Sequence, residues 1–193
     1  VEKKIREYLI SEIDLERPTV FEKGCVYIVP LMEDLTLPKG ISAKANPRST
    51  TGRLDIFTRL LTDYGIEFER VPEGYKGKLY AEMVPRTFTI LARQGMRLNQ
   101  LRFIRGNPPS PDTQLNQLNE NETLGYLDED SPAEAQIHKG LRVSVNLQGK
   151  DRSEIIGYKA KKNAPVIDLQ KVDYYDPNDF WDPLYTPKPG ASS

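Results

Sequence analysis

The chain has 193 residues, 38% of them hydrophobic and 28% charged, and its formal net charge is −1. This length favours one domain, or one domain and part of another. The near-neutral charge argues against a chain-wide basic surface of the kind that binds nucleic acid, and no apolar stretch approaches the ~20 residues that span a membrane. We therefore expect no nucleic-acid partner and no membrane partner.

Short apolar runs separated by glycine and proline turns dominate the first part of the chain. They occupy residues 25–32, 41–45, 78–84, 88–92 and 97–104. Short strands at close spacing with such turns are typical of a β-sandwich or barrel. The pattern predicts an all-β domain that ends near residue 106.

Residues 49–63 break this strand pattern. The segment opens with hydroxyl-bearing residues suited to cap a helix, and apolar residues from Leu54 to Leu61 follow at helical spacing. We therefore expect a helix that begins directly after Arg48.

Residues 107–136 are polar, acidic and rich in Asn, Pro and Asp, which is typical of a polar linker or long surface loop. Strand patterns resume at 141–147, 155–158 and 166–169. Residues 137–193 are therefore expected to hold additional strands and a tail, as at the start of a second repeat of the fold.

The tail is unusually aromatic. It carries Tyr174, Tyr175, Phe180 and Trp181 within eight residues, and aromatic residues are enriched at protein interfaces. A lone domain would expose these rings as an apolar patch. We expect the tail to pack against a neighbouring repeat or subunit.

Residue counts exclude two classes of catalytic site. The chain has one histidine, His138, and one cysteine, Cys25, whereas a zinc deaminase needs a Cys-x-x-Cys pair besides a further ligand. A Ser-His-Asp hydrolase would have to use His138, at the edge of the polar segment. A lone cysteine also excludes an intrachain disulfide and fits a reducing cytoplasm. We expect no zinc and no metal held by protein ligands.

Residues 46–53 (NPRSTTGR) carry the first chemical signal. Arg48 and Arg53 can donate charge-assisted hydrogen bonds to phosphate oxygens. The three hydroxyl residues between them stand where the free amides at a helix start point outward. The segment fits a triphosphate cradle, and it equally fits a capped helix with two solvated arginines.

Residues 74–83 carry the second signal, a turn with two glycines that leads into a strand. Period two places the apolar side chains on one face and those of Lys78, Tyr80 and Glu82 on the other. A carboxylate in mid-strand is unusual. Glu82 is thus either a solvent-facing edge residue or a partly desolvated general base.

Three segments, in this order and at this spacing, resemble the dCTP deaminase family of the dUTPase superfamily. They are the Arg-Ser-x-x-x-Arg stretch 48–53, the Gly-aromatic-x-Gly turn 74–77 with Glu82, and the Gly-Met-x-Leu-x-Gln stretch 95–100. Residues 45–65 look especially like a longer bacterial form with two dUTPase-like repeats. The resemblance covers roughly residues 20–106, and residues 1–106 would form a dUTPase-like nucleotide-binding domain.

The resemblance implies a distorted jelly roll, or dUTPase-like β-barrel, with a short helix after the Arg-Ser motif. It implies a homotrimer or two-repeat pseudo-trimer with sites between neighbours. The implied activity is hydrolytic deamination of dCTP to dUTP and ammonia. The alternatives are a dUTP diphosphatase, an enzyme with both activities, and a non-catalytic nucleotide-binding or scaffold domain.

The resemblance also assigns roles to residues. Glu82 would be the general acid/base, and Arg53 would help to place the water and Glu82. Mg²⁺ would arrive on the nucleotide, and no metal would act at the base. Tyr80 and Ala81 would offer backbone groups to the base edge. The expected substrate-binding residues are Arg48, Ser49, Thr50, Thr51, Gly52, Asp63, Tyr80, Ala81 and Gln100.

Overall fold

The computed structural model describes residues 1–106, 111–127, 131–147, 149, 151 and 153–186. The chain divides into two compact units. Unit 1 consists of Val1–Gly106 and Lys159–Asp182, and unit 2 consists of Asn107–Tyr158 and Pro183–Ser193.

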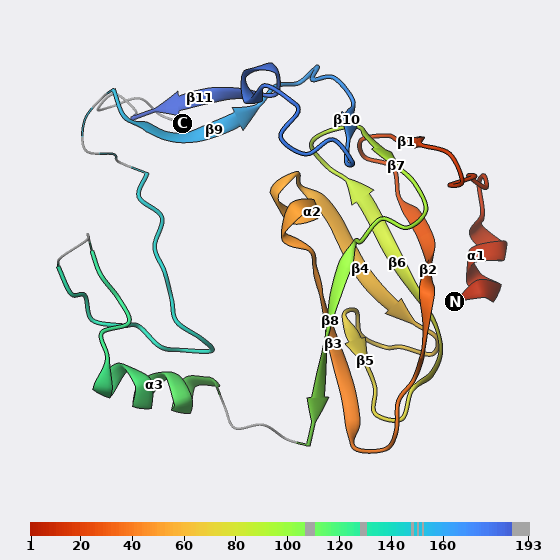
Figure 1. Cartoon of the computed structure of the whole chain (residues 1–193), viewed down its shortest axis with the longest axis horizontal. Coiled ribbons are helices and arrows are strands. Elements are labelled where there is room, and N and C mark those ends of the chain that lie inside the picture. The colour runs from red at the N-terminus through yellow and green to blue at the C-terminus, as the bar shows by residue number, and fades with distance from the viewer. Residues whose placement is uncertain (107–110, 128–130, 148, 150, 152, 187–193) are drawn as a thin grey trace. The chain divides into compact units, whose positions relative to one another are not determined.

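Strands make up most of the regular structure in the described residues (Figure 1), which confirms the predicted all-β class. They form three sheets of three strands and one of two strands, and in the described part of the chain none of these closes into the expected barrel. The elements are α1 (Glu2–Tyr8), β1 (Thr19–Phe21), β2 (Tyr27–Thr36), β3 (Ile41–Pro47), α2 (Ser49–Arg53), β4 (Ile56–Thr62), β5 (Arg70–Val71), β6 (Lys76–Pro85), β7 (Ile90–Ala92), β8 (Asn99–Arg105), α3 (Pro111–Asn121), β9 (Ile155–Ala160), β10 (Ile167–Asp168), the 3-10 helix η1 (Pro177–Asp179) and β11 (Trp181–Tyr185).

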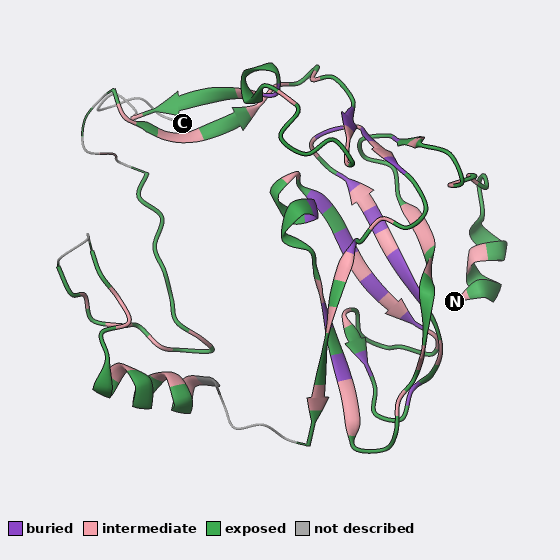
Figure 2. Ribbon diagram, viewed as in Figure 1, coloured by how far each residue is buried: buried purple, intermediate pink, exposed green. Residues whose placement is uncertain are grey.

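The sheet β2-β6-β4 is the centre of unit 1. All its neighbours are antiparallel, and Ala81 of β6 lies opposite Val29 of β2 and Leu60 of β4. Buried residues alternate with more exposed ones along β4 and β6 (Figure 2), because successive side chains of a strand point to opposite faces. One face therefore packs into the core, and the other presents polar groups.

The predicted helix over 49–63 is correct only for its first turn. α2 ends at Arg53, and Asp55 adopts a left-handed backbone conformation with φ of 52° that a continuing helix cannot contain. Residues 56–62 then pair with β6 and bury every second side chain. The apparent helical spacing arose because Leu60 and Leu61 are both apolar, although only Leu60 belongs to the buried face.

Two apolar clusters hold unit 1 together. The larger one contains Phe21, Met83, Phe88 and Ile90, and it also takes in Phe180 from the C-terminal part of the chain. The smaller one joins the central sheet to the sheet β5-β3-β8, and its buried members are Ala43, Ala45, Leu60, Val71, Tyr75 and Leu79.

The aromatic tail contributes to the larger cluster. Phe180 is only 3% exposed, and both its ring and that of Trp181 meet Phe88 edge to face, with centroids 5.7 and 5.1 Å away. The expectation that these two rings pack on a neighbouring repeat or subunit is therefore wrong, because unit 1 itself supplies their partner. The side chain of Tyr174 remains exposed.

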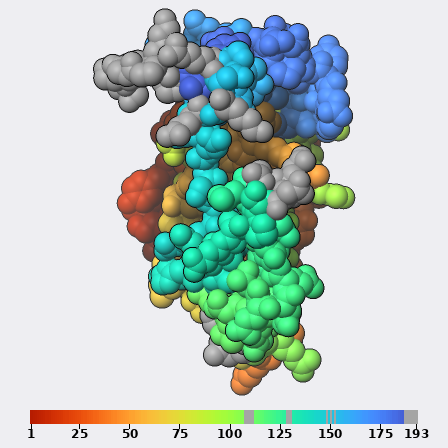
Figure 3. Space-filling model, turned by 90° about the vertical axis from the view of Figure 1, so that its left-hand side faces the viewer, coloured from red at the N-terminus to blue at the C-terminus, as the bar shows by residue number. Residues whose placement is uncertain are grey.

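Unit 2 differs from its sequence prediction in two places. The segment predicted as a linker or loop contains α3, whose Asp112 accepts hydrogen bonds from the amides of Lys139 (2.6 Å) and Gly140 (2.7 Å). Figure 3 shows α3 and the following segment in green and blue-green, side by side. Residues 141–147, predicted as a strand, form only an isolated bridge between Leu141 and Ile137 in the described residues. Alternating polar and apolar residues are compatible with an extended strand, but they do not show whether a second strand is present to pair with it.

If the tail belongs to the core of unit 1, Phe180→Ala should lower the free energy of unfolding by about 3–5 kcal/mol, as for a buried Phe truncated to Ala. Val172→Ala is the matched control, because Val172 lies in the same stretch but is 79% exposed. Urea unfolding followed by fluorescence measures both variants. Equal, small losses would contradict the assignment of Phe180 to the core.

Candidate functional site

Glu82 lies in the middle of β6, and its carboxylate forms an ion pair within the central sheet. The guanidinium of Arg59 on β4 donates from Nη2 to Glu82 Oε1 at 2.7 Å. The two side chains are 32% and 17% exposed, respectively. Because β6 has a hydrogen-bonded strand on each side, Glu82 does not occupy a solvent-facing edge.

Arg59 is the residue that the sequence analysis missed. It was hidden in the segment interpreted as a helix, whereas period two over 56–62 would have placed it on the polar face beside β6. Its guanidinium lies 3.8 Å from the ring centroid of Phe68 and 4.7 Å from that of Phe57. Its Nε is buried and has no hydrogen-bond partner among the described residues.

Tyr80 shares the polar face of β6 with Glu82 but is itself buried. Burial raises the pKa of its hydroxyl, and the carboxylates of Asp63 and Glu2 raise it further. The carboxylate of Glu2 is close enough to influence the pKa of the Tyr80 hydroxyl, but the two groups do not reach hydrogen-bond geometry. The hydroxyl has no hydrogen-bond partner in the described part of the chain.

The backbone ladder beside Tyr80 is interrupted. Pro30 of β2 lies opposite Tyr80, and the register of β2 then shifts between Pro30 and Asp34. Ala81 follows with its side chain in the core. If Ala81 contacts a ligand at the polar face of β6, it can do so only through its backbone groups. The interruption in the strand pairing lies next to these groups.

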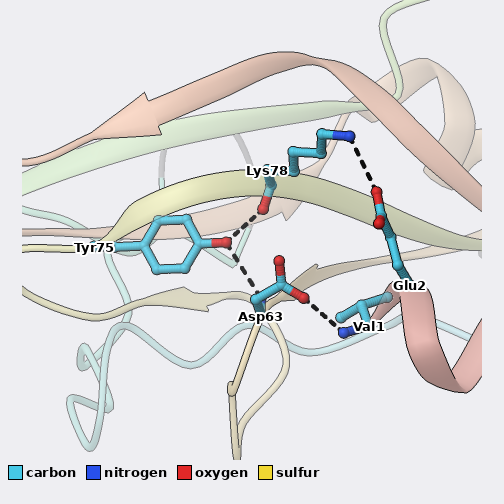
Figure 4. Close-up of polar contacts among 5 residues, drawn as sticks. All are labelled: Val1, Glu2, Asp63, Tyr75 and Lys78. Carbon is cyan, nitrogen blue, oxygen red and sulfur yellow. Dashed lines mark hydrogen bonds and ion pairs between the residues drawn. The ribbon is translucent and has the colours of Figure 1, made fainter.

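Asp63 follows the last residue of β4, close to the N-terminal residues (Figure 4). Its Oδ1 is 2.6 Å from the α-amino group of Val1, and its amide donates to the hydroxyl of Tyr75 at 3.2 Å. That hydroxyl donates in turn to the carbonyl of Lys78. The ammonium of Lys78 meets Glu2 at 3.0 Å, and this contact lowers the pKa of the Glu2 carboxyl.

The segment after β3 carries the arginines proposed for phosphate binding. Thr51 is buried, and its hydroxyl donates to the carbonyl of Arg48 at 2.6 Å, so it stabilises the turn. By contrast, the residues on either side of it are exposed, namely Arg48, Ser49, Thr50, Gly52 and Arg53. Within the described residues neither arginine has an acidic partner, which leaves both guanidinium groups available to an anion.

Gln100 lies next to this segment. β8 pairs with β3 so that Gln100 faces Asn46 and Asn99 faces Pro47, and the amide of Arg48 donates to the carbonyl of Leu98 at 2.9 Å.

The sequence-predicted residues therefore fall into two groups in unit 1. Arg48 and Gln100 lie at the end of the sheet β5-β3-β8, whereas Glu82 and Tyr80 share one face of β6. Arg53, expected to help place Glu82, forms no hydrogen bond or ion pair with it among the described residues, whereas Arg59 does.

Glu69 is a second charged residue that the sequence did not reveal. Its backbone amide donates to the carbonyl of Leu60, its carboxylate Oε1 accepts from the amide of Leu60, and its carbonyl accepts from the amide of Ala45. It thus bridges β4 and β3 with a left-handed backbone, φ 65°. Burial raises the pKa of its carboxyl, and the charges of Arg59 and Lys44 partly oppose this shift.

Two further features concern the described part of the chain. No three His, Cys, Asp or Glu side chains there come close enough to hold a metal ion. None of its helices has the length and apolar character needed to cross a membrane.

Known proteins resemble the chain along almost its whole length. Residues 1–107 match the family model of the 2'-deoxycytidine 5'-triphosphate deaminase (DCD) N-terminal domain, and residues 111–191 match that of the C-terminal domain. The crystal structure of 2'-deoxycytidine 5'-triphosphate deaminase from Agrobacterium tumefaciens is 44% identical, with a TM-score of 0.85. That match covers 97% of this chain and 55% of the other, so this chain spans about half the length of its relative. Among curated proteins no match is found.

The pKa of Glu69 predicts a pH dependence of stability. Because folding raises this pKa above its ordinary value of 4.5, the stabilising effect is fully present below the unfolded pKa and is lost as pH rises through the folded pKa. Glu69→Gln keeps an acceptor for the amide of Leu60 but does not ionise. We therefore expect its stability relative to wild type to increase as pH rises from about 4 towards neutrality.

Urea unfolding of both proteins over this pH range measures the difference. Glu67→Gln is the control, because this neighbouring carboxylate is largely exposed and its replacement should change stability little. A difference between Glu69→Gln and wild type that stays constant with pH would show that burial of Glu69 does not control its ionisation.

Proposed function

The chain belongs to the 2'-deoxycytidine 5'-triphosphate deaminase family, and from this premise we propose that the protein deaminates dCTP hydrolytically to dUTP and ammonia. The observation that carries the proposal is the half-buried Glu82 on the central strand. One of its oxygens pairs with Arg59, and in the described structure the other has no hydrogen-bond partner. Such a carboxylate is held in place and can still exchange a proton.

The proposed reaction uses Glu82 as general acid/base. Its carboxylate accepts a proton from a water molecule, whose oxygen forms a bond to C4 of the cytosine. The same carboxyl group then protonates the exocyclic amine, the C4–N4 bond breaks, and ammonia leaves. N3 takes up the electron pair of its bond to C4 and gains a proton, and the hydroxyl on C4 loses its proton, which gives the C4 carbonyl and N3–H of uracil. Arg53 would help to place the water. The proposal involves no metal at the base and no zinc.

The base would lie against β6, beside the interrupted ladder. The backbone of Tyr80 and Ala81 would offer hydrogen-bonding groups to its polar edge, because the register of β2 shifts directly beside Tyr80. Asp63, which directly follows the strand β4 next to β6, would complete this end of the site.

The triphosphate would bind to the exposed residues of the segment after β3. Arg48 and Arg53 supply charge-assisted donors, Ser49 and Thr50 supply hydroxyls, and Gln100 lies on the neighbouring strand. Gly52 would let the backbone approach closely, and Thr51 would keep the turn in place. Mg²⁺ would neutralise the triphosphate as part of the substrate, with no protein ligands required.

We also propose that the active particle is a homotrimer or a two-repeat pseudo-trimer. Supporting this, residues 142–147 of unit 2 are extended, and they expose the apolar side chains of Val143, Val145 and Leu147. An exposed apolar row of this kind is typical of a contact surface.

The test of the function is Glu82→Gln. This variant should bind dCTP as wild type does, because the isosteric amide leaves the pocket shape unchanged, and it should lose roughly 10²-fold or more in turnover because it has lost the general base. Ammonia release from dCTP measures turnover, and pyrophosphate is measured in the same samples. Glu67→Gln, an exposed glutamate, is the control. Turnover within a few-fold of wild type would refute the role of Glu82. No ammonia from dCTP, together with pyrophosphate release when dUTP is supplied as the substrate, would indicate a dUTP diphosphatase instead.

The phosphate contact predicts a second result. Arg48→Ala should weaken dCTP by roughly 1.5–3 kcal/mol and leave deoxycytidine almost unaffected, because the lost hydrogen bond is to the triphosphate. Calorimetric titration with both ligands measures this difference, with Arg70→Ala as the exposed control arginine. Equal weakening of the two ligands would argue against a phosphate role.

A further inference from the structure

We propose that Arg59, together with the rings of Phe57 and Phe68, positions the carboxylate of Glu82 for proton transfer. The inference rests on the proposed function and adds to it a positioning residue from the neighbouring strand. Three features of the structure support it.

The first feature is the strand register. Arg59 of β4 lies directly opposite Glu82 of β6. Side chains at directly opposed positions of two paired strands are close enough to interact. The ion pair of 2.7 Å between Nη2 and Oε1 follows from this register. It occupies one carboxylate oxygen, and in the described structure the other oxygen forms no hydrogen bond.

The second feature is the aromatic contact on the guanidinium. Fixing an arginine side chain in one rotamer costs conformational entropy. A half-exposed ion pair contributes little free energy to offset this cost. Here Phe68 lies 3.8 Å and Phe57 4.7 Å from the guanidinium, measured to their ring centroids. Cation–π attraction to two rings restricts the arginine independently of Glu82. The arginine is therefore ordered before a ligand arrives.

The third feature is the unused donor of Arg59. Its Nε is buried without a partner in the described residues, which costs stability. Glu69 attracts the same guanidinium from the other side of β4, as the effect of Arg59 on the pKa of Glu69 shows. A side chain selected for stability alone would not keep a buried donor unpaired, whereas local violations of this kind are expected at functional sites.

Positioning has a direct chemical consequence. A catalytic group must be held within about 0.5 Å of its productive geometry, and a displacement of roughly 1 Å can cost on the order of 10²-fold in rate. A planar guanidinium held by two rings defines both the position and the orientation of the Glu82 oxygens. The compact ammonium of lysine would match the charge but not the planar geometry.

The experiment compares Arg59→Gln, Arg59→Lys and Phe68→Leu with Arg70→Gln, whose guanidinium is exposed and paired with Glu67 at 3.2 Å. We expect Arg59→Gln to lower kcat for dCTP on the order of 10²-fold and to leave KM and calorimetric dCTP affinity within a few-fold of wild type. Arg59→Lys should recover part of kcat, and Phe68→Leu should lower kcat with the charge intact. Arg70→Gln should behave as wild type.

A double mutant separates positioning from independent catalysis. If Arg59 acts through Glu82, Arg59→Gln should cause no further loss of kcat in the Glu82→Gln background, because residues that act as one unit are non-additive. A multiplied loss, a rise in KM at unchanged kcat, or an Arg59→Gln variant as active as Arg70→Gln would each overturn the inference.

Two controls keep the result interpretable. Circular dichroism and thermal unfolding show whether each variant folds. If Arg59→Gln does not, Phe68→Leu decides, since an unchanged kcat there would overturn the inference. Ammonia release by wild type is measured first. Its absence would refute the proposed function and this inference with it, whereas an active wild type with an equally active Arg59→Gln would refute the inference alone.

Discussion

β6 is hydrogen-bonded to β2 along one side and to β4 along the other, so each residue in its middle has fixed neighbours on both strands. The side chains of Ala81 and Met83 therefore point into the larger apolar cluster, and the side chain of Glu82 between them points to the opposite face of the sheet. A one-residue slip of this register would place a carboxylate in the core. The same packing that stabilises unit 1 thus holds the candidate catalytic group on the open face.

Four buried polar atoms in and around this sheet have no hydrogen-bond partner among the described residues. Arg59 Nε, Thr62 Oγ1, Glu69 Oε2 and the hydroxyl of Tyr80 all lie on β4, on β6 or in the loop between them. Each such atom costs roughly 1–3 kcal/mol of desolvation. Burial in the apolar clusters offsets this cost, and the contacts of Phe180 and Trp181 with Phe88 add to the larger cluster.

Sequence reasoning recovered those features that depend on local periodicity. The alternation of Leu79, Tyr80, Ala81 and Glu82 placed the polar side chains of β6 correctly, although it did not show that Tyr80 is buried. It failed over 54–63 because a run of apolar residues fits helical and strand spacing equally well when Leu60 and Leu61 are adjacent. The position of Arg59 beside Glu82 was missed because Arg59 lies in that misassigned segment. Glu69 and Phe180 were beyond its reach, since their burial depends on partners distant in sequence, namely Ala45 and Phe88.

One continuous stretch connects the two groups of the candidate site. β3 belongs to one sheet and β4 to another, and only α2 with the turn at Asp55 separates them. The arginines proposed for the triphosphate lie on this connection, and Arg59, the partner of Glu82, follows on β4. Thr51 anchors the connection through its bond to the carbonyl of Arg48. Thr51 thereby helps to fix the connection between the residues proposed to bind the triphosphate and those proposed to face the base, and β8 and β6 hold the strands on either side of it.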